Sequence, residues 1–112
     1  GEGDFQVIDI SNKRNPKIVG HVSTFFSRFV ELSDRYAFLS GGGIGYGLLI
    51  VDISNPASPK LAAPDPAWLP PTGASIGEVR SRGNFLFVTT YPDKKTLENL
   101  AKAAKNPPIS NR

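Results

Sequence analysis

Two aspartates recur at equivalent positions and are the first candidates for chemistry. Asp9 and Asp52 lie 43 residues apart, and each closes an apolar run and is followed by Ile-Ser-Asn. A hard-cation site needs several oxygens around one ion, and Asp-Ile-Ser-Asn does not match the spacing of a calcium loop. A carboxylate at a strand end can instead accept hydrogen bonds from the amides of the following turn. We therefore predict a structural role for both aspartates, in preference to a repeated calcium or catalytic site.

His21 is the only histidine of the chain, and the sequence contains no cysteine. This chain alone therefore cannot supply a multi-histidine zinc or copper site, a thiolate site or a disulfide framework. A Ser-His-Asp arrangement within this chain would have to use His21. We expect His21 at a strand end or in a loop, and we assign no catalytic residue, no metal ligand and no cofactor. An enzyme is less expected than a non-enzymatic chain but is not excluded.

The glycine-rich run at residues 41–47 invites comparison with a phosphate-binding loop. It contains no Gly-Lys-Ser/Thr and no GxGxxG, and it lies between two apolar runs with no helix to follow it. We predict a hairpin loop between two strands. Because its side chains are small, a partner could approach its backbone closely, so Tyr46 is retained as a candidate partner-binding residue.

The elements that position these residues occur twice. Residues 5–16 read Phe-Gln-Val-Ile-Asp-Ile-Ser-Asn-Lys-Arg-Asn-Pro, and residues 48–59 read Leu-Leu-Ile-Val-Asp-Ile-Ser-Asn-Pro-Ala-Ser-Pro. Both faces of each expected strand are largely apolar, which is typical of a strand covered on both sides. Each copy then enters a turn and a short second strand.

A second block is repeated as well, at residues 30–39 and 79–88, with an offset of 49 residues. In each block a two-residue turn, Asp34-Arg35 or Gly83-Asn84, precedes an aromatic-rich strand. Repeated all-β units of this length are typical of propeller blades. We predict repeats at about residues 3–47 and 48–91, followed by a helical, basic tail or insertion at 92–112.

The apolar copy at residues 48–56 resembles the repeat named LVIVD after its own core. Residues 59–61, 36–39 and 85–88 also fit that pattern, whereas Gln6 and Lys13 depart from it in the first copy. The resemblance covers about residues 3–91. It implies an all-β fold of short antiparallel strands, a partial propeller of about two blades with roughly four strands each. It also implies an extracellular, cell-surface or periplasmic protein, and it carries no catalytic residue.

The linker at residues 63–72 is six residues longer than its counterpart in the first unit, and it is rich in proline. It also holds the only tryptophan. An exposed Trp68 beside Leu69 could anchor a partner, or Trp68 could fill the hollow between blades. Both interpretations remain open, and we take Trp68, Leu69 and Tyr46 as candidate partner-binding residues.

The chain ends in an expected short helix. Leu97, Leu100, Ala101 and Ala104 have helical spacing, and Asp93 could cap the helix. We expect this helix to pack on a blade edge or to fill an insertion. Residues 1–92 balance eight basic against eight acidic residues, so the tail supplies the net charge of +3. This distribution disfavours nucleic-acid binding, and no apolar run is long enough to span a membrane.

Closed propellers need roughly four to eight blades, more than this chain holds. No methionine is present and residues 3–5 begin in mid-blade, so we expect a segment of a longer propeller, with a ring of several copies as the alternative. In both cases the terminal strands have unpaired edges that another polypeptide must cover. The preferred function is non-enzymatic protein contact or assembly. The alternatives are part of a propeller enzyme whose active or metal residues lie elsewhere, and a ring that binds glycans or small ligands.

Overall fold

A computed structural model describes residues 3–25, 27–41, 47–64, 66–70, 74–92 and 94–105. The described part is all-β with one short C-terminal helix, as predicted. Its elements are β1 (Gly3–Asp9), β2 (Lys17–Thr24), β3 (Phe29–Ser33), β4 (Tyr36–Ser40), β5 (Leu49–Asp52), β6 (Lys60–Leu61), β7 (Ser75–Arg82), β8 (Phe85–Tyr91) and α1 (Lys94–Lys105).

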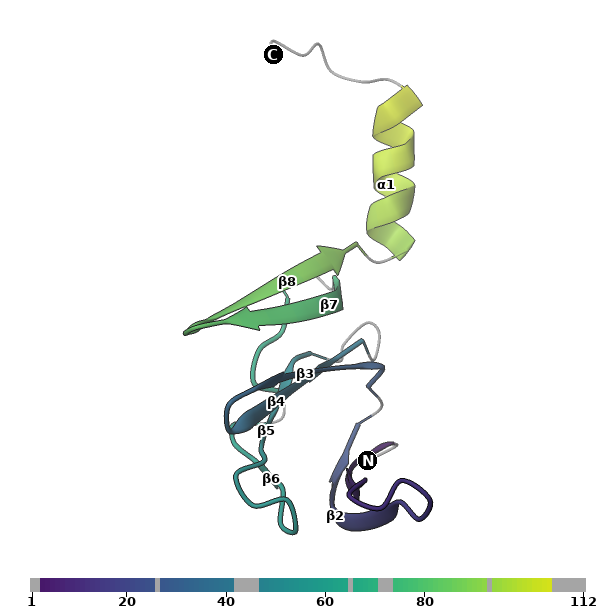
Figure 1. The fold of residues 1–112 in the computed structure, drawn as a ribbon. Coiled ribbons are helices and arrows are strands. Elements are labelled where there is room, and N and C mark those ends of the chain that lie inside the picture. The colour runs from purple at the N-terminus through teal and green to yellow at the C-terminus, as the bar shows by residue number, and fades with distance from the viewer. Residues whose placement is uncertain are drawn as a thin grey trace.

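The strands form small antiparallel sheets that follow one another along the chain (Figure 1). A four-stranded middle sheet has the order β3-β4-β5-β6, and the pairs β1-β2 and β7-β8 form two-stranded sheets on either side of it. The middle sheet runs from residue 29 to residue 61. It therefore crosses the boundary that the sequence analysis predicts between the two repeats, at residues 47 and 48.

The two predicted hairpin turns are confirmed. Asp34 has φ 50° between β3 and β4, and Gly83 has φ 58° between β7 and β8. A positive φ at the first turn residue is what two-residue hairpins require, because it matches the twist of the flanking strands. Glycine adopts it freely, and aspartate is among the few side chains that tolerate it.

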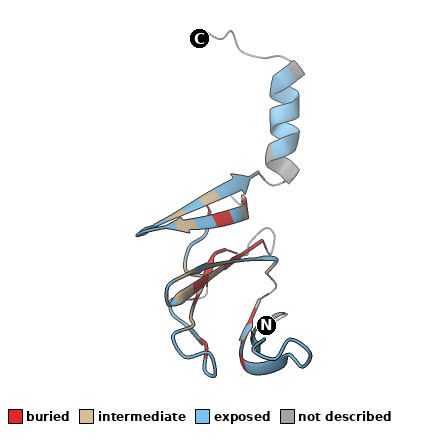
Figure 2. Cartoon of the chain, viewed as in Figure 1, coloured by how far each residue is buried: buried red, intermediate tan, exposed pale blue. Residues whose placement is uncertain are grey.

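The core lies on the two faces of the middle sheet, where most of the buried residues are found (Figure 2). One face buries Ala37, Leu39, Leu49 and Val51 against side chains that include Phe5 and Val22 of the β1-β2 sheet. The opposite face packs against β7-β8, where the cluster consists of Leu48, Ile76 and Val79, with Phe38, Ile50, Leu86 and Val88 around it. The three sheets are therefore stacked face to face.

The two copies of the apolar strand differ in burial. In β5, Leu49 and Val51 are fully buried on one face, and Ile50 packs against the β7-β8 cluster on the other. The prediction of a strand covered on both sides is therefore confirmed for the second copy. In β1, Ile8 is 49% exposed, and Ile10 just beyond the strand is 63% exposed. The physical reason is position in the stack, because among the described residues β1 has a neighbouring sheet on one face only.

The helix α1 forms where it was predicted, but it does not pack on the strands. It projects away from the β7-β8 sheet (Figure 1), and Leu97 and Leu100 are 53% and 57% exposed. The expected packing on a blade edge is therefore wrong for this chain. The proposed cap, Asp93, lies outside the described residues. No helix of the described residues is long and apolar enough to cross a membrane.

The molecule is elongated, with extents of 60 × 30 × 30 Å and a radius of gyration of 18.0 Å. A compact domain of this length would have a radius of gyration of about 13 Å. The difference reflects an open stack of sheets with a projecting helix.

Candidate interaction surfaces

The turn after β5 is organised by Asp52. Its Oδ1 accepts hydrogen bonds from the Ser54 hydroxyl at 2.7 Å and the Ser54 amide at 2.9 Å, and Arg35 donates to its Oδ2 at 2.9 Å. The bonds from Ser54, followed by the bond from Arg35, lower the pKa of Asp52 from 3.8 to about 2. The structural role predicted for this aspartate is confirmed.

The turn after β1 repeats the same construction. Asp9 accepts the Ser11 amide at 2.8 Å, and hydrogen bonding from Ser11, chiefly from its backbone, lowers the pKa of Asp9. Asn12 and Asn55 each accept the amide two residues further on at 3.1 Å. The repeated Asp-Ile-Ser-Asn sequence therefore builds two equivalent turns in which side-chain oxygens satisfy backbone amides.

His21 lies inside β2, opposite Gln6 of β1, and not at a strand end or in a loop as expected. Its side chain is 65% exposed, and its Nδ1 lies 3.3 Å from Oδ1 of Asp4. Within the described part of the chain, no group of three or more histidine, cysteine, aspartate or glutamate side chains could hold a metal ion.

The glycine-rich run links β4 to β5, which pair antiparallel, so the predicted hairpin connection is confirmed. Residues 42–46, which include the candidate Tyr46, lie outside the described residues. At the end of the run, Gly47 is buried beneath the Trp68 backbone, and a Cβ at this position would strike the carbonyl oxygen of Trp68. Glycine is required here because of this close backbone approach.

The proline-rich linker extends the edge of the middle sheet. The Leu48 amide donates to the Trp68 carbonyl at 2.8 Å, and the Ala67 amide donates to the Leu48 carbonyl at 2.7 Å. Just beyond β6, the Ala62 amide donates to the Ile50 carbonyl of β5 at 2.8 Å, and the linker then pairs with Leu48, directly before β5.

Trp68 also lies at the junction of two sheets. With Leu48, Leu86 and Val88 it lines a hollow of about 250 Å³. Trp68 remains 42% exposed and Leu69 50% exposed. Trp68 thus partly fills the space between neighbouring sheets, which is one of the two predicted roles, and the rest of its surface is open to solvent.

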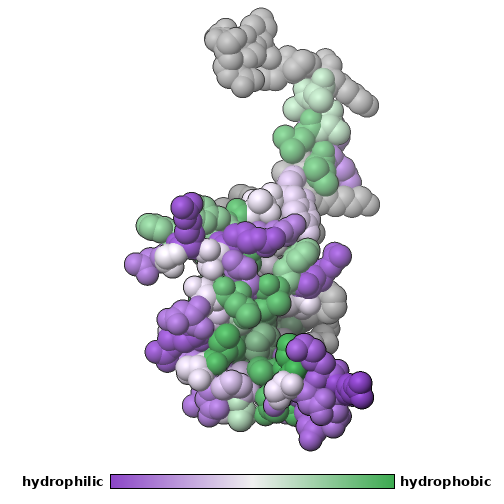
Figure 3. Space-filling view, viewed as in Figure 1, coloured by the Kyte–Doolittle hydropathy of each residue, from purple (hydrophilic) through white to green (hydrophobic). Residues whose placement is uncertain are grey.

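Both terminal sheets have an open edge. Among the described residues, β1 pairs only with β2, and β8 pairs only with β7. On β8, Phe85 and Phe87 are 70% and 59% exposed. Figure 3 shows an apolar patch bordered by hydrophilic residues on one face of the molecule. Exposed apolar surface next to an unpaired strand edge is typical of an interaction site.

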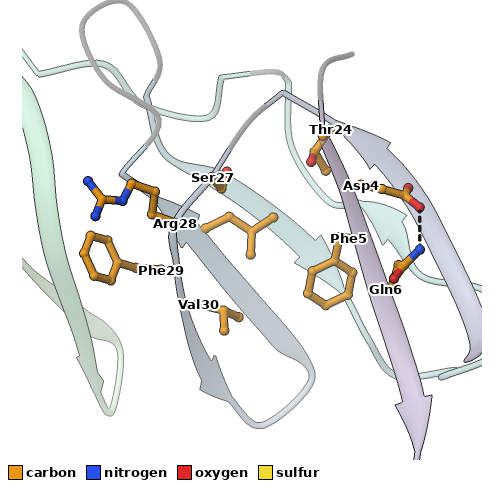
Figure 4. Close-up of a pocket in the computed structure, with 10 residues that line it drawn as sticks. Asp4, Phe5, Gln6, Thr24, Ser27, Arg28, Phe29 and Val30 are labelled. Atoms are coloured by element: carbon orange, nitrogen blue, oxygen red, sulfur yellow. Dashed lines mark hydrogen bonds between the residues drawn. The ribbon is translucent and has the colours of Figure 1, made fainter. Parts of the chain in front are cut away.

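A groove runs beside the open edge of β1. It consists of two hollows of about 390 and 320 Å³ that share Phe5, Gln6 and Val30. Figure 4 shows the first of them, with Phe5 of β1 and Val30 of β3 on the two facing strands. Leu32 of β3 lines the second hollow and is 61% exposed. Sequence reasoning predicted the open edges but missed this groove, for which the only signal was the apolar content of β3.

Stacked antiparallel sheets built on a repeated strand-and-turn unit are the features of a propeller-type repeat protein. The family model described as LVIVD repeat matches residues 1–24 and 27–63, more than half of the chain. The chain therefore belongs to the LVIVD repeat family. The second matched segment contains all four strands of the middle sheet, and residues 64–91, which were included in the sequence resemblance, lie outside the match. No curated protein and no solved structure matches the chain significantly.

Proposed function

We propose that the chain is part of a β-propeller whose role is protein–protein contact through its open strand edges, without catalysis of its own. The observation that carries the proposal is that, within the part of the chain that the structure describes, β1 and β8 each pair along one edge only. An unpaired edge presents a row of N–H and C=O groups, and the addition of a strand to such an edge is a general mode of protein recognition.

The hydrogen bonds of the polar side chains support a structural role for the chain. Asp9 and Asp52 are engaged by the turns that follow them, and Arg35 is held by Asp52. These groups fix the ends of the strands and thereby present the sheet edges in a defined geometry. The extracellular or periplasmic setting implied by the resemblance is part of the same proposal.

A synthetic peptide of residues 48–61, which forms β5, its turn and β6, tests the contact function. β4 pairs with β5, and β8 is the repeat of β4, so this peptide should bind to the open edge of β8. Trp68 is the only tryptophan and lies beside Leu86 and Val88. Its fluorescence should therefore change saturably as the peptide is added.

A peptide of the same composition in scrambled order is the matched control and should leave the fluorescence unchanged. Equal responses to the two peptides, or no response to either, would contradict edge recognition. Location of the binding to β8 is checked by amide hydrogen exchange, because added strand pairing must slow exchange along that strand.

A further inference from the structure

The two ends of the stacked sheets carry different kinds of connection. The Ser40 hydroxyl, opposite Phe29 at the start of β3, donates to the Gly77 carbonyl near the start of β7 at 3.0 Å. Further along, the Ser81 amide of β7 donates to the Glu31 side chain of β3 at 2.7 Å. β3 and β7 therefore run in the same direction. The turns after β3, β5 and β7 lie at one end of the sheets, and β4, β6 and β8 finish at the other, which we call the loop end.

The second unit departs from the repeat at the loop end. The linker between β6 and β7 is six residues longer than its counterpart, and its Trp68 carbonyl accepts the amide of Leu48, directly before β5, at 2.8 Å. β8 is followed by α1 (Figure 1), whereas its counterpart β4 is followed by the glycine-rich run that leads to β5. Two enlarged connections therefore extend from the same end of the sheets.

Neighbouring blades leave this end uncovered. The blades of a propeller are arranged around a central channel, so adjacent blades cover the faces of a sheet, and the ends of its strands stay on the surface of the ring. This holds for any number of repeats around the middle sheet. The loop end is therefore a surface separate from the strand edges of the proposed contact function.

Large apolar side chains are exposed at the loop end. Trp68 and Leu69 in the linker, and Leu97 and Leu100 in α1, each keep about half of their surface open to solvent. Figure 3 shows hydrophobic side chains along α1 with hydrophilic ones beside them. α1 has 12 residues, and a helix this short gains most of its stability from the packing of its apolar side. No described strand provides that packing, so the helix is suited to an external surface.

The helix is also the basic part of the chain. α1 contains four lysines and one glutamate, a net charge of +3. Residues 1–92, in contrast, balance eight basic against eight acidic residues. A helix with lysines on its polar side and leucines on the other is typical of helices that lie in the interface of a membrane.

We propose that the loop end docks on the surface of an anionic membrane. The exposed side chains of the linker and of α1 enter the interfacial layer, and the positive charge of α1 faces the lipid headgroups. The Trp68 ring suits that layer, because its large apolar body and its single N–H donor match an environment that is apolar on one side and wet on the other. Each lysine held close to an anionic surface strengthens binding about fivefold.

Two features favour a lipid surface over an acidic protein. The apolar side chains come from two separate connections, and a fluid surface accepts both without the matching shape that a folded partner would need. Stable attachment to a membrane surface also takes more than one weak signal. The linker with Trp68 and the basic helix provide two such signals at the same end of the sheets.

The fluorescence of Trp68, the only tryptophan, tests the docking on the full 112-residue chain. Vesicles of equal parts phosphatidylcholine and phosphatidylserine should shift its emission saturably to shorter wavelengths, because the ring leaves water. Vesicles of phosphatidylcholine alone should bind at least about tenfold more weakly. In 1 M salt, where the screening length falls to about 3 Å, most of this difference should disappear.

Leu100→Gln tests the apolar side of α1. Binding to the anionic vesicles should weaken at least about fivefold, because the exposed part of this leucine no longer leaves water, and glutamine keeps the helix propensity of leucine. The matched control is Leu32→Gln, since Leu32 is similarly exposed but lies near the other end of the middle sheet. Equal losses in the two variants would place the contact elsewhere and overturn the proposal.

Lys102→Gln tests the charge of the helix in the same way. It should weaken binding to the anionic vesicles about fivefold. The control Lys60→Gln removes an equally exposed charge at the start of β6, at the opposite end of the sheets, and should leave binding unchanged. The same loss from both changes would indicate attraction by overall charge and would contradict docking through α1.

Poly-L-glutamate and vesicle sedimentation distinguish the remaining outcomes. If poly-L-glutamate shifts the Trp68 emission and the anionic vesicles do not, the partner is an acidic polypeptide and the membrane proposal is wrong. Sedimentation with anionic vesicles without a change in Trp68 emission would also overturn it, because the linker would then stay outside the lipid. Absence of binding to both vesicle types has the same consequence and leaves the edge contact unaffected.

Discussion

Truncation of Val51 to alanine should destabilise the chain strongly, whereas the same truncation at Val30 should not. Val51 in β5 is fully buried, and Val30 in β3 is 55% exposed. Each change removes two methyl groups, worth about 0.8 kcal/mol apiece when fully buried. At Val51 a cavity term adds to this, for a total of about 2 to 3 kcal/mol, whereas Val30 should lose less than about 1 kcal/mol.

Both positions are in strands, so the loss of β-propensity on replacing valine by alanine affects the two variants similarly. Urea denaturation measures the difference. With a slope of about 1.5 kcal/mol/M, Val51→Ala should lower the unfolding midpoint by about 1 to 2 M. Equal shifts for the two variants would refute the conclusion that the faces of the middle sheet form the core.

Two further predictions concern a turn and a close contact. Because the pKa of Asp52 is about 2 in the folded chain and 3.8 without its partners, its contribution to stability is present above pH 3.8 and is lost as the pH falls through about 2. The melting temperature of the Asp52→Asn variant should therefore depend less on pH in that range than that of the unchanged chain. An equal dependence in both would argue against the hydrogen bonds of Asp52 in the turn. Gly20→Ala should cost about 1 to 3 kcal/mol in chemical denaturation, since its Cβ would strike the carbonyl oxygen of Pro56. Gly83→Asn is the control, because Gly83 has φ 58° with nothing near its Cβ and asparagine tolerates that conformation; similar losses in both variants would contradict the close approach.

Local patterns predicted much of the fold. The alternation of apolar residues gave the strands of both copies, and the dipeptides Asp34-Arg35 and Gly83-Asn84 gave the hairpin turns, because these features depend on neighbouring residues. The role of Asp52 was predictable for the same reason, since its hydrogen-bond partner Ser54 lies two positions away.

Features that depend on contacts between residues distant in the sequence were harder to predict. The sequence gives no sign that β2 continues through Gly20 to His21, because that continuation depends on pairing with β1. The spacing of Leu97 and Leu100 predicts a helix with an apolar side but does not say what covers it. The groove beside β1 is likewise invisible in the sequence, because it depends on where β3 lies relative to an unpaired edge.

The match of one family repeat to one whole sheet has a consequence for how such proteins evolve. Because the matched segment 27–63 contains all four strands of the middle sheet, a duplication or deletion of that unit adds or removes a complete sheet. The number of sheets can therefore vary between descendants of one gene while the hydrogen bonding within each sheet stays the same.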